Sequence, residues 1–366
     1  MHFRCEKRDL IESISIVQKA ILGKSPMAVL EGIYIEAVNN EVIMRGTDID
    51  LSIETILKST ILEEGTIVLD SKLFGDFVRK LPDSIIELAT MENNSILISC
   101  ENSEFNLLYL TAEEFPILPE IENAEKITIK ENVLKNLIKG TSFAVAQDET
   151  RPILMGVLFE LKNKVLNMVA LDGFRLALRS EYIESNEDVS VVIPGKTLNE
   201  ILKILGDGDR DIYISYNDNH IMFEIDKTKI VSRLLSGNFI KYESIIPTDH
   251  KLQFKVKRNS FAQSIERASL MAKDGSSRLI KLNIENDEVV ITSNSQFGKV
   301  REEIPIEMEG DSLEIAFNSN YLMDILKVMT EEDIIVEMTS GVSPTIIRNS
   351  MTDNCKYMVL PVRLTR

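Results

Sequence analysis

Apolar residues recur along the chain in three segments that align at a spacing of 124 residues without a gap. The segments are residues 71–81 (SKLFGDFVRKL), 195–205 (GKTLNEILKIL) and 319–329 (SNYLMDILKVM). In each segment the shared apolar positions fall at i, i+3, i+4 and i+7, which is the spacing of one buried helix face. We therefore predict that the chain contains three copies of one structural unit.

Each copy also begins alike, with a short alternating segment, a polar break and another helical stripe. The alternating segments are residues 3–5, 127–129 and 254–256, and the helices that follow are predicted over 8–20, 132–145 and 259–272. The polar breaks at 8–9, 131–132 and 259–260 contain Asp, Asn and Ser, so we expect them to supply the helix N-caps.

Between the two helices of each copy, apolar and polar residues alternate with period two. Examples are GIYIEAV (32–38), GVLFELK (156–162) and IKLNIEN (280–286). This pattern predicts strands with one buried face. The predicted fold class is α+β, with three repeated domains that each pack two helices on antiparallel sheet. We place the domains at residues 1–121, 126–247 and 252–366, with short linkers near 120–126 and 247–252.

The composition is that of a globular chain in a reducing compartment. Apolar residues make up 44% of the 366 residues. No run approaches the roughly 20 apolar residues of a membrane span. The N-terminal MHFRCEKRDL lacks the apolar core of a signal peptide. The three cysteines are far apart, which argues against a disulfide framework and a cysteine metal site. We expect a cytoplasmic protein with no membrane partner.

The net charge of −17 argues against a nucleic-acid partner, but the charge is unevenly distributed. The six predicted helices carry a net charge of +5, which leaves −22 on the strands and loops. One interpretation is that short helices simply expose their Lys and Arg side chains. The other is that the helices line one surface that faces an anion.

The sequence contains no motif for catalysis or cofactor binding. His2, His220 and His250 form no metal-binding pair, and there is no Walker loop, G-x-G-x-x-G segment or G-x-S-x-G segment. We therefore predict a protein that is not an enzyme and that uses no cofactor and no metal. A hydrolase that uses a pair of carboxylates among the 58 acidic residues stays open as an alternative.

Two segments interrupt the repeat, namely Asp172–Ala177 (DGFRLA) in the second copy and Pro361–Leu364 (PVRL) near the C-terminus. With the threefold repeat, they resemble the D-G-x-R-L-A and P-x-R-L motifs of the bacterial sliding clamp family, the beta subunit of DNA polymerase III. The resemblance covers the whole chain. It implies a DNA clamp fold in which two chains join head to tail as a homodimer and close a ring around double-stranded DNA.

The resemblance also implies where the ring meets DNA and where the subunits meet. The residues that match DNA-facing positions, each of which taken alone is more typical of a solvated surface, are Lys24, Lys72, Arg79, Lys80, Gln147, Arg151, Lys196 and Arg278. The residues that match the subunit contact are Phe105 and Leu107 in the first domain and Leu270 and Met271 in the third. DNA contact in this family is independent of base sequence, so the ring slides.

Finally, the resemblance implies a pocket between the second and third domains. It binds short linear motifs of the clamp loader, the replicative polymerase alpha subunit, other polymerases and repair proteins. The matching residues are Leu154, Leu171, Gly173, Phe174, Arg175, Leu176, Ile240, Ile245, Asn318, Tyr321, Val342, Met358, Val359, Leu360, Pro361, Val362 and Arg363.

These pocket positions are not all equally specific. Taken singly, Leu154, Ile245 and Val359 are also typical of an ordinary core. Arg175 and Arg363 are expected to bind a carboxylate or carbonyl oxygen of the partner. Familiar Thr, His and Pro residues are replaced by Leu171, Phe174 and Ile240, which predicts a more apolar pocket. A scaffold that binds peptides without encircling DNA is the main alternative function.

Overall fold

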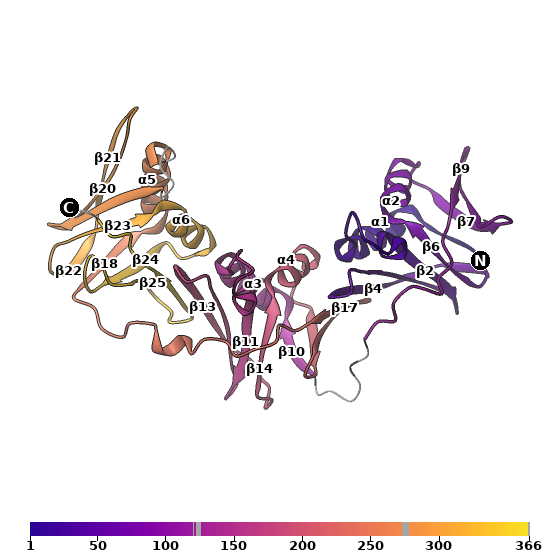
Figure 1. The fold of residues 1–366 in the computed structure, drawn as a ribbon, viewed down its shortest axis with the longest axis horizontal. Helices are drawn as coiled ribbons and strands as arrows, with labels where there is room; N and C mark the ends of the chain where they lie inside the picture. Colours follow the sequence, from indigo (N-terminus) through magenta and orange to yellow (C-terminus); the bar gives the residue numbers. More distant parts are fainter. Residues whose placement is uncertain (120, 122–125, 273–277, 365–366) are drawn as a thin grey trace. The chain divides into compact units, whose positions relative to one another are not determined.

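The structure is a computed structural model, and it describes residues 1–119, 121, 126–272 and 278–364 (Figure 1). The chain forms two compact units. Unit 1 contains Met1–Asn132 and Asn199–Leu234, and unit 2 contains Val133–Leu198 and Leu235–Arg366. The predicted linker near 120–126 lies mostly outside the described residues.

The helices predicted from the apolar spacing are present. They are α1 (Lys7–Val17), α2 (Ser71–Lys80), α3 (Glu131–Thr141), α4 (Gly195–Ile204), α5 (Arg258–Met271) and α6 (Ser319–Val328). The first shared apolar position of the repeat is Phe74, Leu198 or Leu322, and each is at most 1% exposed. The spacing therefore marked the buried face of the second helix in every copy.

Unit 1 contains two antiparallel sheets (Figure 1). The five-stranded sheet has the order β5 (Thr60–Glu63), β1 (His2–Glu6), β7 (Ile85–Met91), β8 (Ser95–Cys100) and β9 (Ser103–Leu108). The eight-stranded sheet has the order β10 (Ile127–Lys130), β15 (Asp211–Tyr216), β16 (His220–Ile225), β17 (Thr228–Arg233), β4 (Leu51–Lys58), β3 (Glu41–Thr47), β2 (Gly32–Val38) and β6 (Gly65–Asp70). Helices α1 and α2 lie side by side, and α1 packs on β3 and β4.

Unit 2 repeats this plan with two further antiparallel sheets. The nine-stranded sheet has the order β14 (Val189–Pro194), β11 (Gly156–Lys162), β12 (Val165–Leu171), β13 (Arg175–Tyr182), β26 (Cys355–Val359), β25 (Thr345–Asn349), β24 (Asp333–Met338), β18 (Leu252–Lys257) and β22 (Glu307–Gly310). The four-stranded sheet has the order β21 (Gly298–Pro305), β20 (Glu288–Ser295), β19 (Leu279–Glu285) and β23 (Leu313–Asn318). Helices α5 and α6 pack together, and α5 covers β20 and β21.

One strand pair joins neighbouring repeats in each unit. In unit 1, β17 pairs with β4, with Ile230 opposite Ile53. In unit 2, β26 pairs with β13, with Tyr357 opposite Ala177. Because β4 and β13 begin 124 residues apart, the two junctions are equivalent within the repeat. Among the described strands, β9 pairs only with β8 and β21 only with β20, so each leaves one edge open.

The N-cap prediction is wrong, because the first helix of each repeat begins where the preceding strand ends. The N-cap residues of α1 and α5 make no side-chain capping bond. Instead, the first helical N–H donates to a carbonyl that follows the second helix of the same repeat. The pairs are Lys7 to Ser84 (3.3 Å), Glu131 to Arg210 (2.8 Å) and Arg258 to Glu332 (2.9 Å). Carbonyl groups distant in sequence therefore accept hydrogen bonds from the first backbone N–H groups of these helices, which have no partner within the helix.

The side chain at the first helical position strengthens the same connection. Lys7 donates to the Leu81 carbonyl, and Arg258 Nη1 donates to the Leu326 carbonyl (3.2 Å). Both cations thus lie at the C-terminal end of the second helix, where they complement its dipole.

In the middle repeat, the first helical residue is acidic, and its side chain also connects the first helix to the segment after the second helix. The Glu131 carboxylate is fully buried and accepts hydrogen bonds from the Gly206 N–H (2.6 Å) and from Arg210 Nε (2.9 Å) and Nη2 (2.6 Å). These bonds satisfy a charge that burial alone would destabilise.

Replacing Glu131 with Ala is expected to lower the free energy of unfolding by about 2–3 kcal/mol, because it removes the acceptor that Gly206 and Arg210 share. Urea unfolding followed by circular dichroism measures the change. Glu149→Ala, at an exposed loop position, is the control and should change stability by less than about 0.5 kcal/mol. An equal loss in both variants would contradict the role of Glu131.

Candidate functional site

The segment Asp172–Ala177 forms the turn into β13, and its first two residues shape that turn. The Asp172 carboxylate accepts hydrogen bonds from the backbone N–H groups of Phe174 (2.9 Å) and Arg175 (3.0 Å). Gly173 has a φ of +91°, a left-handed conformation that favours glycine. The Asp-Gly pair therefore fixes the direction in which Phe174 and Arg175 leave the turn.

Arg175 lies at the centre of a bonded cluster within unit 2. Its Nε donates to Asp172 (3.0 Å), its Nη1 to Asp324 (2.6 Å) and its Nη2 to the Phe143 carbonyl (2.8 Å). The guanidinium also lies over the rings of Tyr321 (4.7 Å) and Phe143 (5.3 Å). Since each nitrogen has a partner in the chain, the geometry favours a positioning role over the predicted contact with a partner's carboxylate.

Tyr321 and Phe174 form an aromatic wall beside this cluster. Their ring centroids are 6.1 Å apart and the ring planes differ by 19°. Phe174 is 59% exposed. Burial, together with the Asp172 carboxylate, raises the pKa of Tyr321. The Tyr321 hydroxyl therefore stays protonated at neutral pH and is able to donate a hydrogen bond.

The C-terminal segment returns to this turn, so the two motifs that interrupt the repeat meet. β26 lies beside β13, and beyond it the Leu360 N–H donates to the Phe174 carbonyl (2.8 Å). The Val362 N–H donates to the Ala316 carbonyl (2.8 Å). Between them Pro361, which has no N–H, ends the strand. The structure thus brings together residues nearly two hundred positions apart.

The apolar residues of the predicted pocket include both buried and exposed side chains. Leu154, Leu171, Leu176 and Met358 belong to one core cluster, and each is at most 6% exposed. Exposed apolar side chains in the same unit are Ile240 (39%), Ile245 (39%) and Val342 (67%). The predicted pocket residues thus combine buried and exposed apolar side chains, as expected of a site for a linear peptide motif.

The remaining predicted pocket residues play different parts. Val359 is fully buried and pairs in the sheet, which agrees with the ordinary-core interpretation. Asn318 caps α6 by accepting the Asn320 N–H (3.0 Å). Arg363 is exposed, so a bound peptide has direct access to its guanidinium.

Tyr242 is a residue that the sequence analysis missed. It is 5% exposed, and its hydroxyl donates to Glu160 (2.8 Å) and accepts from Asn167 (3.3 Å). Burial and the Glu160 carboxylate raise the pKa of Tyr242. These two hydrogen bonds connect the segment after Phe239 to β11 and β12. The only sequence signal was a tyrosine three residues beyond an aligned phenylalanine.

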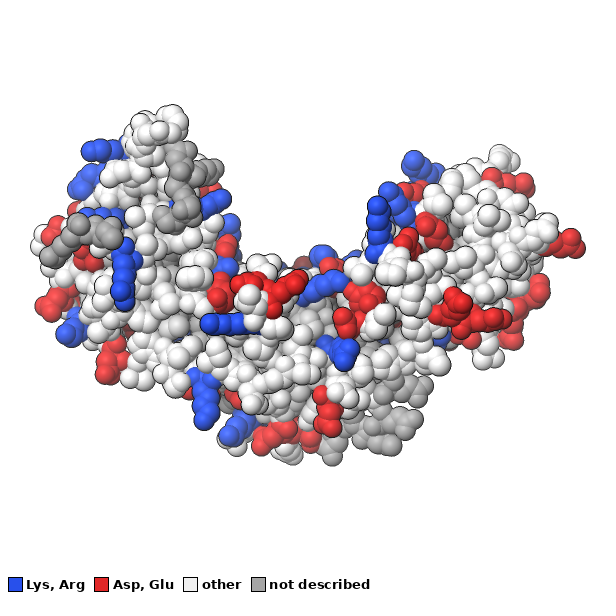
Figure 2. Space-filling model, in the orientation of Figure 1, with Lys and Arg blue, Asp and Glu red and all other residues white. Residues whose placement is uncertain are grey.

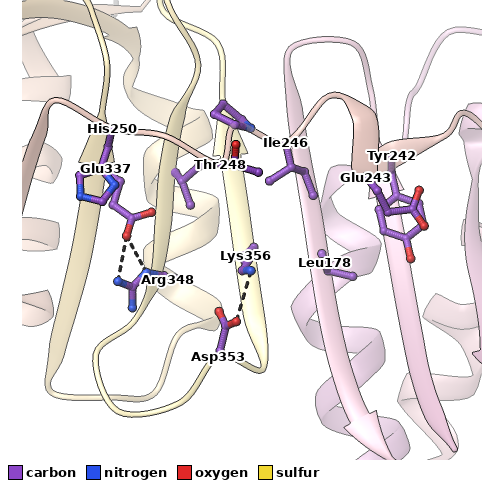
Figure 3. A pocket seen from close by; sticks show the side chains of 12 residues that line it. Leu178, Tyr242, Glu243, Ile246, Thr248, His250, Glu337, Arg348, Asp353 and Lys356 are labelled. Atoms are coloured by element: carbon purple, nitrogen blue, oxygen red, sulfur yellow. Dashed lines mark hydrogen bonds and ion pairs between the residues drawn. The ribbon is translucent and has the colours of Figure 1, made fainter. Parts of the chain in front are cut away.

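A cavity of about 630 Å³ lies beneath this segment (Figure 3). Its apolar lining consists of Pro247 and four cluster residues, and its polar lining includes two ion pairs, Glu337–Arg348 and Asp353–Lys356. The four cluster residues are Leu178, Tyr242, Ile246 and Ile346. The predicted pocket residues do not line this cavity, although both sets include members of the same core cluster.

All eight residues predicted to face DNA are exposed. Lys72, Arg79 and Lys80 lie on α2, where Arg79 also donates to Asp76 (2.9 Å). Figure 2 shows Lys and Arg side chains gathered over the helices of unit 1, whereas many acidic side chains of that unit lie away from them. Within this unit, the distribution agrees with the charge imbalance calculated from the sequence.

The predicted subunit-contact residues lie on or beside β9 and β21, two of the edge strands of the described sheets. Phe105 and Leu107 are on β9, and the Phe105 ring packs 4.7 Å from Phe77. Leu270 and Met271 end α5, which covers β21. Leu270 is 56% exposed. Each set therefore borders a strand with unpaired backbone groups.

Two other properties of the described residues bear on function. They contain no group of three or more His, Cys, Asp or Glu side chains arranged to hold a metal ion. None of the helices in this part of the chain is long and apolar enough to cross a membrane.

Comparison with known proteins matches the whole chain to one family. Residues 1–119, 128–241 and 243–363 match the N-terminal, central and C-terminal domains of the DNA polymerase III beta subunit. The beta sliding clamp of Staphylococcus epidermidis is 36% identical over 374 aligned positions, which cover 99% of each chain.

Solved structures give the same result. The DNA polymerase sliding clamp of Bacillus subtilis has a TM-score of 0.97 and 37% identity, with 100% of both chains covered. The DNA polymerase III beta chain of Streptococcus pneumoniae has a TM-score of 0.96 and 30% identity, covering 99% of this chain and 100% of that one. These matches confirm the predicted fold class. The chain belongs to the DNA polymerase III beta subunit family, the bacterial beta sliding clamps.

Proposed function

We propose that this sliding clamp closes into a ring of two copies that encircles double-stranded DNA and tethers other replication proteins to it. The observation that carries the proposal is that two edge strands, β9 and β21, are related by the repeat to the strands that pair at the two internal junctions. Three repeats have three junction surfaces, and the chain satisfies two of them internally. The third requires a second copy, whose β21 pairs with β9 while its own β9 is paired in return.

The repeat also indicates which strands make this contact. In unit 1, β17 pairs with β4, and the repeat relates these strands to β9 and β21. We therefore infer a head-to-tail contact between β9 of one copy and β21 of the other. Leu270 and Met271 would then cover Phe105 and Leu107 and exclude water from the junction.

The clamp is a processivity factor and not an enzyme, so its DNA contact has to be weak and independent of sequence. Exposed Lys and Arg on the helices contact phosphates, and each step along the duplex replaces one phosphate with another. The acidic remainder of the chain repels DNA elsewhere. The cytoplasm is the compartment in which such a protein meets chromosomal DNA and the polymerase.

The partner site is the apolar surface between β13, α6 and the C-terminal segment. It binds linear motifs of the clamp loader, the replicative polymerase and repair proteins. The Phe174–Tyr321 wall and the floor of Leu154, Leu176 and Met358 receive apolar side chains, and Arg363 meets a carbonyl or carboxylate.

Tyr321→Ala is expected to weaken binding of the peptide QLSLF about tenfold or more, because it removes one side of the aromatic wall. Fluorescence anisotropy of the labelled peptide measures the affinity. Tyr182→Ala, which changes an exposed tyrosine of the same unit, is the control and should bind like the unchanged chain. Equal affinity of the peptide for all three proteins would contradict the assignment of the pocket.

The proposed dimer predicts a mass of twice the 41.4 kDa of one chain in light scattering after size exclusion. Leu270→Glu buries a carboxylate in the proposed junction and should shift the protein toward the monomer at micromolar concentration. Leu62→Glu, on the other edge strand of the five-stranded sheet, should leave the dimer unchanged. A monomeric unchanged chain would count directly against the ring.

A further inference from the structure

A two-residue hairpin turn marks the same point in each repeat. The turns are residues 39–40, 163–164 and 286–287, and both residues of every turn have positive φ. Fourteen residues beyond each turn lie Glu54 on β4, Leu178 on β13 and Arg301 on β21. These three residues are therefore equivalent, and we call the place that they share the junction position.

A second hairpin turn locates the opposing strand of the junction. Residues 101–102 connect β8 to β9, and residues 226–227 connect β16 to β17. Two residues beyond these turns lie Glu104 and Lys229. Lys229 lies opposite Glu54 in the pair of β17 with β4. Glu104 on β9 is thus equivalent to the lysine that faces the junction position inside the chain.

The two internal junctions both place a lysine opposite the junction position. In unit 1, Lys229 Nζ lies 3.9 Å from a carboxylate oxygen of Glu54. In unit 2, Lys356 on β26 lies opposite the apolar Leu178. Inside the chain, the opposing strand is therefore always the basic one.

The strands β9 and β21 carry the reverse charge order. The opposing strand β9 has the acidic Glu104, and β21 has the basic Arg301 at its junction position. Both side chains are exposed. Arg301 Nη2 lies 2.5 Å from Glu303 on the same strand, but 60% of its side chain is open to solvent. Its guanidinium is therefore accessible to a carboxylate of a second copy.

The register of the internal junction also brings apolar residues together when it is applied to β9 and β21. It places Phe105 opposite Val300, just as Ile230 lies opposite Ile53 in unit 1. Phe105 and Val300 are both half-buried in the single chain. A slip by one residue would place Phe105 opposite a charged side chain, so burial and charge favour the same register.

Pairing between the wrong edges brings like charges together. If β9 met β4, Glu104 would lie opposite Glu54. If β21 met β17 or β26, Arg301 would lie opposite a lysine. Like charges directly opposite each other destabilise a strand pair, whereas opposite charges stabilise it. The charge order thus discriminates between strand edges that share the same backbone geometry.

We propose that the charges at the junction position determine which strand edges of the repeats pair, and that Glu104 of one copy meets Arg301 of a second copy. The partner of each edge is then the same chain, read with the reverse charge order. This inference rests on the proposed ring, because it takes β9 and β21 as the strands that meet. It adds a reason why edges of another copy do not replace the internal strands.

Reversing one charge at a time tests the proposal. In a homodimer of Glu104→Arg, two cations meet at both junctions, and in a homodimer of Arg301→Glu, two carboxylates meet. We expect each variant to raise the dissociation constant of the dimer about tenfold or more, measured by light scattering over a dilution series. The loss should be smaller at about 0.5 M salt, because screening weakens the repulsion.

Mixing the two variants tests whether charge order selects the partner. A heterodimer of Glu104→Arg with Arg301→Glu has opposite charges at both junctions, so the mixture should dimerise about as tightly as the unchanged chain. Native mass spectrometry with one variant labelled with nitrogen-15 distinguishes the heterodimer from either homodimer. A single chain that carries both substitutions should also form a dimer.

The control is Glu92→Arg, which reverses an exposed charge on the β7–β8 turn of the same sheet and should dimerise like the unchanged chain. Circular dichroism confirms that each variant is folded. A dimer that neither single variant weakens, or folded variants that do not pair with each other, overturns the charge pairing and leaves the ring in place. An unchanged chain that is monomeric overturns the ring itself.

Discussion

Pairing of strand edges between repeats is the constraint on which the rest of this structure depends. A sheet edge exposes backbone N–H and carbonyl groups, and an unpaired edge invites association with another chain. The chain pairs β4 with β17 and β13 with β26, and it leaves β9 and β21 with one open edge each. The same repeat that stabilises each unit therefore creates the surface through which we propose that two copies close a ring.

The repeat also explains why the chain carries its specific sites at junctions. Each junction is crossed by a segment that packs apolar residues onto the shared sheet, Phe115 in unit 1 and Phe239 in unit 2. The Asp172 turn has a counterpart at Asp48 in unit 1, but only the second junction also receives the C-terminal segment. Equivalent backbones with different side chains therefore give the two junctions different surfaces.

Elements with strong periodicity were predictable from the sequence, and contacts between distant residues were not. The apolar stripes that end in Leu81, Leu205 and Met329 located the second helices at their observed starts and to within one residue of their observed ends. The first helices began earlier than predicted, because carbonyls such as Ser84 replace local caps. Arg175 was identified as a site residue, but its three internal partners depend on how β13, α6 and Phe143 meet. The hydrogen bonds of Tyr242 to Glu160 and Asn167 depend on the folded sheet and were not predictable from the sequence.

Retention on circular DNA tests the central claim most directly, because encirclement depends on topology and not on affinity. The clamp is loaded onto a nicked circle by its clamp loader and is then passed through a gel-filtration column at about 0.5 M salt, which removes proteins held only by phosphate contacts. We predict that it stays with the circle and is lost once a restriction enzyme linearises the DNA. Loss from the intact circle, or equal retention on linear DNA, would contradict a closed ring.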